Sequence, residues 1–158
     1  MQRIAKFSKV SWEQFVKDWK DTFGDVTEDK IKEIYNNIKL PKRSTAMSAG
    51  HDISIPFDTS IKNGEIVKIP TGIRCKMDDG YVMFVFPRSS MGIKKGMVIC
   101  NTIPVIDGDY FGADNEGHIF ICVTNTYKKP IELNSGDNIV QAVFTKFGVA
   151  DDEEITEK

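Results

Sequence analysis

Apolar residues recur at two different periods along this chain, and the change falls near residue 41. In the first part they repeat every three or four residues, which is the spacing of one face of an α-helix. In the rest they gather in short β-prone runs separated by turn residues. The pattern predicts a helical hairpin at the N-terminal end, followed by a mainly β fold.

The first helix is expected from Ser11 to Phe23, because Ser11 and Gln14 have the spacing of a capping box. A second helix is expected to begin at Thr27, with acids in its first turn, and to stop at Pro41. The apolar stripe of the first helix consists of Trp12, Phe15, Val16, Trp19 and Phe23, and that of the second consists of Ile31, Ile34, Tyr35 and Ile38. Packing of the aromatic stripe on the same domain is favoured over a partner-binding face.

Short strands are expected after residue 41, with turn residues between them. Six runs have this character: 53–57, 65–71, 81–86, 97–100, 119–123 and 140–147. Turns are expected at Asn63-Gly64, Asp79-Gly80, Asp107-Gly108 and Ser135-Gly136. Many short strands at this spacing favour a closed or sandwiched all-β fold.

Composition excludes several classes of protein. The 158 residues suit one domain, and a net charge of −2 gives no basic field for nucleic acid. The chain begins without a signal-peptide run and has no apolar segment of membrane-spanning length, which predicts a soluble protein of the cytoplasm. Cys75, Cys100 and Cys122 fit neither zinc spacing nor a disulfide framework, so buried thiols are expected.

The stretch 101–112, Asn-Thr-Ile-Pro-Val-Ile-Asp-Gly-Asp-Tyr-Phe-Gly, carries the strongest indication of chemistry. Asp-Gly between β-prone residues predicts a tight reversal, with Asp107, Asp109 and Tyr110 at or beside the tip of a hairpin. Side chains at such a tip can face a ligand. Alone, a stretch of this kind is more often a solvated acidic turn, but three further motifs change that interpretation.

The stretch resembles the third motif of the deoxyuridine triphosphatases (dUTPases). Three other motifs occur in that family's order: Ala-Gly-His-Asp-Ile at 49–53, Pro-Arg-Ser-Ser-Met-Gly at 87–92 and Gly-Asp-Asn-Ile-Val-Gln at 136–141. The resemblance implies a dUTPase-type jelly roll. A similar helical extension precedes it in some dUTPases of Gram-positive bacteria and their phages. Three parts are expected: a helical extension over 1–41, a β domain over 42–148 and an acidic tail over 149–158.

The activity that the resemblance implies is Mg²⁺-dependent hydrolysis of dUTP to dUMP and pyrophosphate, in a homotrimer with active sites between subunits. This reaction limits uracil in DNA and supplies dUMP for thymidylate synthesis. Asp107 matches the aspartate that activates the attacking water as general base. Tyr110 matches a ring that lies under the deoxyribose and leaves no room for a 2′-hydroxyl. Asn101 matches the residue whose amide reads the uracil edge. Asp109 is expected to be a structural turn residue.

The other matched residues belong to the phosphate end of the site. Arg88, Ser89 and Ser90 offer a guanidinium fork, hydroxyls and backbone N–H groups to phosphate oxygens. Gln141 matches a residue that contacts the phosphate region in the family. Asp52 matches an acid near the metal and triphosphate, where it would act on Mg²⁺ indirectly, through water.

The sequence also departs from the family's pattern. Pro104 stands where the family usually has glycine, and proline has no N–H to offer to a base. His51 replaces the more usual tyrosine or leucine, and both His51 and His118 are interpreted as packing residues. The glycine-rich fifth motif, whose phenylalanine stacks over bound uracil, is not found in residues 1–158. Either the chain was cut short before that arm, or the protein does without it.

Two other functions stay open at this point. A dCTP deaminase shares the fold but needs a glutamate near the pyrimidine amino carbon, and Glu116 lies well past the expected hairpin tip. A nucleotide-binding regulator could use the same fold and hold a protein partner through the helical extension.

Overall fold

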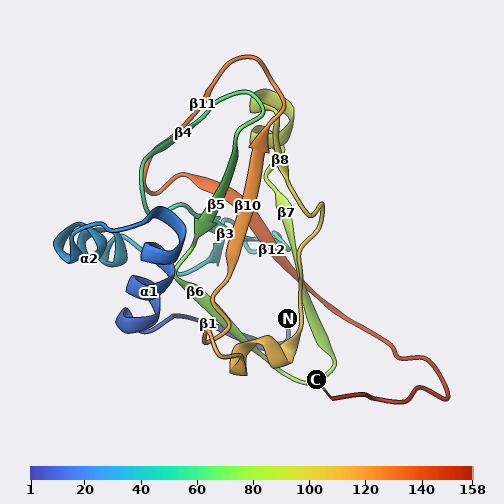
Figure 1. Ribbon diagram of the computed structural model, residues 1–158. Coiled ribbons are helices and arrows are strands. Elements are labelled where there is room, and N and C mark those ends of the chain that lie inside the picture. Colours follow the sequence, from blue (N-terminus) through green and yellow to red (C-terminus); the bar gives the residue numbers. More distant parts are fainter. Residues whose placement is uncertain (158) are drawn as a thin grey trace.

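The computed structural model describes residues 1–157 of the chain, and strands dominate it (Figure 1). The helical elements are α1 (Trp12–Phe23), α2 (Glu28–Asn36), a π-helical turn η1 (Ser90–Lys94) and a 3₁₀ turn η2 (Gly108–Gly112). The strands are β1 (Ala5–Lys9), β2 (Lys42–Arg43), β3 (His51–Ser54), β4 (Thr59–Ile61), β5 (Ile66–Pro70), β6 (Ile73–Met77), β7 (Tyr81–Pro87), β8 (Met97–Ile99), β9 (Val105–Ile106), β10 (Phe120–Asn125), β11 (Ile131–Leu133) and β12 (Asn138–Lys146). A mainly β fold with a helical hairpin is therefore confirmed.

The strands pair antiparallel in two larger sheets and two ribbons. The five-stranded sheet has the order β2-β3-β12-β7-β9, and the three-stranded sheet has the order β5-β10-β8. The ribbons pair β1 with β6 and β4 with β11. In Figure 1 the strands β5 and β10 cross in front of β7 and β12, so the two larger sheets form separate layers.

The core lies between these layers because each strand turns alternate residues inward. On β10 the inward residues Ile121 and Val123 are fully buried. Met83 and Val85 do the same on β7, and Val140 and Ala142 do so on β12. β-branched residues at most of these inward positions allow the strands to hold a common core, and β7 and β12 each bury one further neighbour, Val82 and Ile139.

All six predicted strand runs contain or overlap strands, but the sequence analysis missed six others. Four of these, β2, β4, β9 and β11, are only two or three residues long, too short for a period to show. β6 could have been predicted from its sequence, because Ile73, Cys75 and Met77 alternate with polar residues. In the structure these three side chains are buried. β1 alternates in the same way at Ala5 and Phe7.

The N-terminal part of the chain joins the β fold through a strand, β1, as well as through its helices. It pairs with β6 from Ala5↔Met77 to Lys9↔Ile73, so α1 and α2 stand between two strands of the β structure. The division of the chain at residue 41 stays a prediction.

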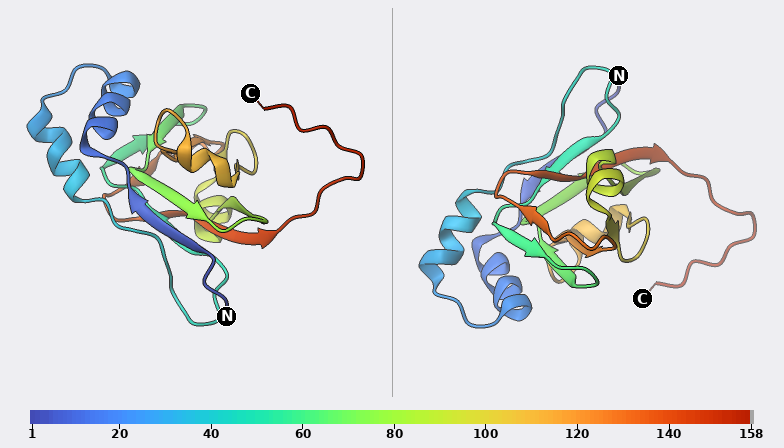
Figure 2. Two further views of the ribbon diagram at one scale, coloured as in Figure 1. Left: turned by 90° about the horizontal axis from the view of Figure 1, so that it is seen from below. Right: turned by 90° about the horizontal axis from the view of Figure 1, so that it is seen from above.

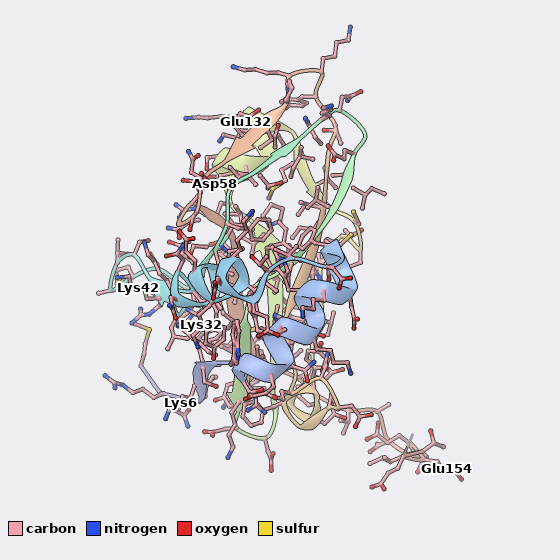
Figure 3. The ribbon with its side chains drawn as sticks, turned by 60° about the vertical axis from the view of Figure 1, so that its left-hand side comes forward. Lys6, Lys32, Lys42, Asp58, Glu132 and Glu154 are labelled. Atoms are coloured by element: carbon pink, nitrogen blue, oxygen red, sulfur yellow. The ribbon has the colours of Figure 1, made fainter. Side chains whose placement is uncertain are left out.

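At the other end of the chain, residues 147–157 leave β12 and extend away from the sheets (Figure 2), and Glu154 lies far from the rest of the molecule in Figure 3.

The helical hairpin packs on the β fold through its apolar stripe, as predicted. Phe15 is fully buried, and its ring lies 5.4 Å from that of Tyr35 on α2. Trp19 is buried against Phe57, which follows β3, with ring centroids 4.9 Å apart. On the outer side Lys32, labelled in Figure 3, extends over the Trp12 ring at 4.5 Å. The stripe is thus largely occupied within this chain.

A buried histidine joins α1 to the β fold at a second point. The Nδ1 atom of His118 lies 2.6 Å from the Asp18 carboxylate, and Nε2 accepts a hydrogen bond from the backbone N–H of Gly72 at 2.8 Å. Because Nε2 accepts, the ring is neutral and Nδ1 carries the proton that is donated to Asp18. Burial lowers the pKa of His118 below its usual value and outweighs the opposing effect of Asp18. His118 is therefore the packing residue that the sequence analysis expected. The second histidine, His51, packs between the rings of Phe7 and Phe144 at 5.7 and 5.3 Å.

The thiols match the expectation only in part. Cys75 is buried, and burial raises its pKa to about 12. Cys100 is exposed and Cys122 is half-buried, so the expectation of buried thiols was wrong for this pair. The reason is that Cys100 lies just past the end of β8, where Cys122 on β10 faces it across the strand pair.

None of the helices within residues 1–157 is long and apolar enough to cross a membrane.

The neutral state of His118 predicts a particular dependence of stability on pH. A folded pKa below the unfolded value of about 6.5 means that the unfolded chain binds the proton first as the pH falls. The free energy of unfolding should therefore be fully retained above pH 6.5 and decline below it, down to the folded pKa. Urea unfolding of the wild type and of His118→Gln from pH 8 to 5 measures this, and His51, whose pKa burial also lowers, is common to both proteins. Equal slopes for the two proteins would contradict the prediction.

Candidate active site

Three of the sequence-predicted residues meet at one end of the five-stranded sheet. β12 pairs with β3 on one side and β7 on the other, which places Gln141 opposite both Asp52 and Phe86. Arg88 comes two residues after Phe86, on the same side of the strand. Its Nη1 atom forms an ion pair with Asp52 Oδ2 at 3.0 Å. Three separate motifs thus contribute one residue each to this cluster.

The cluster is partly shielded from solvent. The side chain of Asp52 is only 12% exposed, whereas that of Arg88 is 35% exposed and can still reach a ligand. Gln141 is half-buried, and a methyl group placed on Gly50 would come within 2.2 Å of its Oε1 atom. Glycine at position 50 therefore leaves the space that the glutamine amide occupies. A guanidinium, an amide and a carboxylate in this arrangement suit the charged end of an anionic ligand.

Ser89 and Ser90 continue directly from Arg88 into η1. Ser89 is exposed at the start of this turn, and Ser90 is its first, half-buried residue. The carbonyl of Arg88 accepts hydrogen bonds from the N–H groups of Met91 and Gly92 at 3.0 and 3.1 Å, which fixes the turn. The two serines thus follow Arg88 directly in the chain, and their role in binding phosphate stays a prediction.

Asp107 and Tyr110 lie in a different place from this cluster. They line a hollow of about 610 Å³ together with Val105, Ile106, Asp109, Gly112, Ala113 and Asp114. Asp107 is exposed, and Tyr110 is half-buried. The hollow is open enough to admit a small molecule beside an accessible carboxylate.

The predicted hairpin reversal at Asp107-Gly108 was wrong. β9 pairs with β7, not with the residues after Gly108, and the chain turns into η2 through a hydrogen bond from Tyr110 N–H to the Asp107 carbonyl at 3.2 Å. A two-residue hairpin of the Asp-Gly type needs left-handed backbone at both central residues. Gly108 does not have it, whereas the glycines of the other predicted turns, Gly64, Gly80 and Gly136, do.

The register of β7 gives the separation of the two groups. Ile106 pairs with Met83, and Arg88 directly follows β7, five residues after Met83. At about 3.3 Å per residue the Cα atoms of Ile106 and Arg88 are therefore about 17 Å apart. Asp107 continues away from Arg88 past Ile106. In Figure 1 the corresponding turns lie at opposite ends of the molecule, η1 (yellow-green) at the top and η2 (gold) at the bottom. One copy of the chain does not bring Arg88 and Asp107 into a single site.

Asn101 and Pro104 lie on the connection between β8 and β9. Asn101 is exposed, and its carbonyl accepts a hydrogen bond from Ile103 N–H at 2.8 Å. Pro104 is buried, and its carbonyl accepts from Val85 N–H at 3.1 Å. Proline is tolerated here because it comes just before β9, where the strand pairing ends and its missing N–H costs one hydrogen bond at most.

Arg74 shapes the Tyr110 side of the site, although it was not among the predicted site residues. Arg74 on β6 donates from Nε to the Glu116 carbonyl at 2.6 Å and from Nη2 to the Phe111 carbonyl at 2.8 Å. Its guanidinium also stacks on the Phe111 ring, 3.6 Å from the centroid. An arginine within an alternating strand pattern gives no local sign of such a role.

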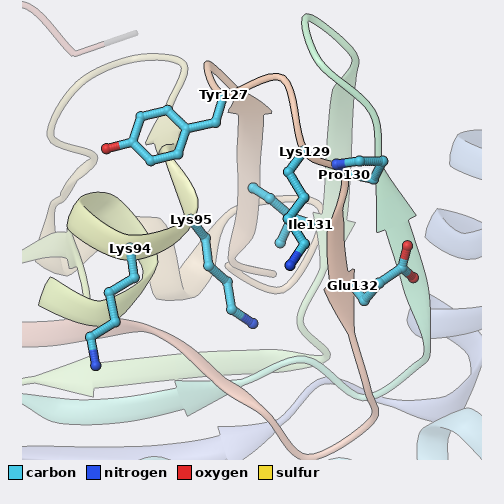
Figure 4. A pocket seen from close by; sticks show the side chains of 7 residues that line it. All are labelled: Lys94, Lys95, Tyr127, Lys129, Pro130, Ile131 and Glu132. Atoms are coloured by element: carbon cyan, nitrogen blue, oxygen red, sulfur yellow. The ribbon is translucent and has the colours of Figure 1, made fainter.

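Two other hollows lie outside these groups. One, of about 350 Å³, is a basic surface pocket with the lysines Lys94, Lys95 and Lys129 beside Tyr127 (Figure 4). The other, of about 390 Å³, lies between α1 and the β fold and is lined by Asp18, Asp21, Thr22, Lys68, Asn115 and Phe120. Within residues 1–157 no group of three or more metal-ligating side chains occurs.

Comparisons with known proteins identify the family of the chain. The family model for dUTPase matches residues 36–157. A protein of Lactococcus lactis named deoxyuridine 5′-triphosphate nucleotidohydrolase is 44% identical over 77% of this chain and 81% of its own length. A protein of the same name from Corynebacterium glutamicum is 34% identical over 84% of this chain and 87% of its own.

Solved structures give the same result. The crystal structure of a dUTPase from Streptococcus mutans is 44% identical, with a TM-score of 0.67 over 73% of this chain and 91% of that one. The dUTPase of Staphylococcus bacteriophage 80alpha matches 99% of both chains with a TM-score of 0.69, at only 16% identity, so it supports the fold alone. The expected dUTPase-type jelly roll with helices before β2 is thus confirmed. By sequence over more than three quarters of its length, and by fold, the chain belongs to the dUTPase family.

Proposed function

We propose that this protein hydrolyses dUTP to dUMP and pyrophosphate, in the cytoplasm of a bacterium or of a phage-infected cell. The observation that carries the proposal is the cluster of Asp52, Arg88 and Gln141, which assembles residues from three family motifs around one ion pair of 3.0 Å. Hydrolysis of this kind would limit uracil in DNA and supply dUMP for thymidylate synthesis.

Arg88, Ser89, Ser90 and Gln141 would hold the triphosphate. A guanidinium can bond two phosphate oxygens at once, and its partial exposure leaves it free to do so. The ion pair with Asp52 orients the guanidinium before the substrate arrives, which lowers the ordering cost of binding. The two serine hydroxyls and the Gln141 amide then add neutral donors around the same charge.

Mg²⁺ would enter with the substrate. This ion retains several waters and is usually held by one or two carboxylates plus phosphates, so a single acid at the site is enough. Asp52 fits an indirect role, because Oδ2 contacts Arg88 and a carboxylate has a second oxygen to accept a hydrogen bond from a metal-bound water. When bound, the ion would neutralise developing phosphate charge.

Asp107 would activate the water. As the water oxygen attacks the α-phosphorus, its proton passes to the Asp107 carboxylate, the bond to the bridging oxygen breaks, and pyrophosphate leaves. Tyr110 would lie under the deoxyribose and exclude a 2′-hydroxyl by contact. Asn101 would read the uracil edge with its amide donor and acceptor. Pro104 cannot donate a backbone hydrogen bond to the base, so uracil recognition here would depend more on side chains.

A homotrimer with shared sites would unite the two groups of residues. Within one chain the Cα atoms of Ile106 and Arg88 are about 17 Å apart by strand register, and Asp107 lies beyond Ile106, so one substrate phosphate would not contact both Asp107 and Arg88. Val105 and Ile103, beside the Asp107 segment, are 56% and 43% exposed, which is apolar surface suited to a neighbouring copy. Asp107 from one subunit would then face Arg88 of the next.

The structure favours this reaction over a dCTP deaminase. Deamination needs a free glutamate near the pyrimidine, and both carboxylate oxygens of Glu116 are bonded to Ser11 at 2.8 and 2.6 Å. A regulator that binds a partner through the aromatic helix is disfavoured because Phe15 and Trp19 are buried within the chain.

The direct test is turnover of dUTP and dCTP with Mg²⁺, with pyrophosphate and ammonia both measured. Pyrophosphate from dUTP without ammonia from dCTP is expected. Ammonia from dCTP would make the protein a deaminase, and binding without either product would make it a nucleotide-binding regulator.

Asp107→Asn should lower kcat by about 10²–10⁴-fold, the usual contribution of a general base, while the dissociation constant for dUTP stays within about tenfold. The amide keeps the shape of the carboxylate but cannot take the proton. Single-turnover kinetics and dUTP titration measure the two quantities. Asp109→Asn is the matched control, because Asp109 is only two residues further along the chain, lines the same hollow and is assigned only a structural role. A near-wild-type rate in Asp107→Asn would remove this residue from the reaction.

Mixing two inactive variants tests the shared site. If Arg88 and Asp107 act from different subunits, co-refolding equal amounts of Asp107→Asn and Arg88→Ala chains should leave roughly a quarter of the sites with both residues intact. About that share of wild-type activity is then expected. Mixing Asp107→Asn with the double variant carrying both substitutions is the control and should give none. A fully active monomer at high dilution would refute the trimer.

A further inference from the structure

The loop of residues 113–118, between η2 and β10, holds the hydroxyl end of Tyr110. Asn115 Nδ2 donates to the Tyr110 hydroxyl at 2.9 Å, and that hydroxyl donates to the His118 carbonyl at 2.5 Å. Gly117 is packed directly against the backbone of the same tyrosine, since a methyl group there would lie 2.6 Å from the Tyr110 carbonyl. The position of the Tyr110 ring therefore depends on the position of this loop.

The start of α1 holds the loop at one point. Glu116 accepts hydrogen bonds from the backbone N–H of Ser11 through Oε1 and from its hydroxyl through Oε2, while the Ser11 hydroxyl accepts from Gln14 N–H at 3.1 Å. A carboxylate at the N-terminal end of a helix also faces the positive end of its dipole. These contacts with Ser11 lower the pKa of Glu116 and so favour its charged form. The backbone of Glu116 is left-handed, with φ of 62°, a conformation that needs such outside support.

The second turn of α1 holds the loop at a second point. Asp18 accepts from the ring of His118 at 2.6 Å, and the same ring accepts from Gly72 N–H. The His118 side chain is fully buried, so losing Asp18 would leave its Nδ1–H without a partner away from water. The ring would then have to shift, and the His118 carbonyl that receives the Tyr110 hydroxyl would shift with it.

Arg74 holds the same loop from the β side, so the loop should not collapse when a contact with α1 is lost. The helix would instead set the fine placement of the ring. An effect of this type changes discrimination between closely related ligands more than it changes folding.

We infer that Asp18 and Ser11, both on the helical hairpin, are positioning residues for Tyr110 and thereby set the discrimination of dUTP against UTP. This inference rests on the proposed function of Tyr110 as the sugar contact. Asp18 acts through His118, and Ser11 acts through Glu116; neither touches the substrate. The helical hairpin, which family motifs do not include, is thus part of the specificity of the site.

The test compares kcat/KM for dUTP and UTP in the wild type and in Asp18→Ala. The ratio of the two values should fall by about tenfold in Asp18→Ala, because the ring no longer excludes the 2′-hydroxyl as firmly. Asp21→Ala is the matched control. Asp21 is an exposed acid on α1 and lines the same hollow between α1 and the β fold as Asp18, but it is not the partner of His118. Asp18→Asn should restore most of the ratio, since its amide oxygen can still accept the His118 proton.

A second measurement separates positioning from loss of stability and from failure of the proposed function. Hydrogen exchange of the amides in residues 108–118 should quicken in Asp18→Ala and not in Asp21→Ala, whichever nucleotide the protein uses. Ile31→Val, in the buried core of α2, supplies a control that lowers stability without touching the loop. An unchanged ratio in an active Asp18→Ala protein, or unchanged exchange in the loop, would overturn the inference. If the wild type lacks dUTP hydrolysis, the proposed function fails, and the exchange result alone decides whether α1 positions Tyr110.

Discussion

The pairing of β12 with both β3 and β7 is the constraint on which the candidate site depends. Asp52, Arg88 and Gln141 are far apart in the sequence, and only this double pairing puts them side by side. Because side chains alternate along a strand, a slip of one residue on either side of β12 would turn Gln141 away from its neighbours. The buried residues Val140 and Ala142 on either side of Gln141 make such a slip costly, so the core itself fixes the geometry of the site.

Local patterns predicted those parts of the molecule that local physics determines. The cap at Ser11, the helical stripes and six of the strands, β7, β10 and β12 among them, follow from spacing and composition, and the structure bears them out. The predicted capping box was only half right, because the side chain of Gln14 bonds Asp18 and the Ser11 N–H donates to Glu116 instead. The prediction of a hairpin at Asp107-Gly108 was wrong because the Asp-Gly pair is compatible with several kinds of turn. Here the backbone of residues 107–113 forms a 3₁₀ turn instead. Arg74, on a distant strand, donates to the Phe111 carbonyl within this turn, and a contact of that kind cannot be predicted from the local pattern.

Other contacts between distant segments could not be predicted from the sequence either. Glu116 bonds Ser11, the cap of α1, across a sequence separation of 105 residues. Nothing in the sequence around Glu116 indicates this contact. Likewise the pattern near Asp18 predicts only a polar position on an amphipathic helix. The family motifs identified the candidate site residues without these partners, because motifs record the residues near a ligand and not the surroundings that hold them in place.

The two edges of the five-stranded sheet have a consequence for how copies of this chain can meet. The sheet ends at β2 and β9, each only two residues long, and such short edges present few unpaired backbone groups. Lys42 and Arg43 also make the β2 edge charged. Both features oppose uncontrolled strand-to-strand aggregation at this sheet. Contacts between copies at the β9 edge would instead involve side chains, and that of Val105 is 56% exposed.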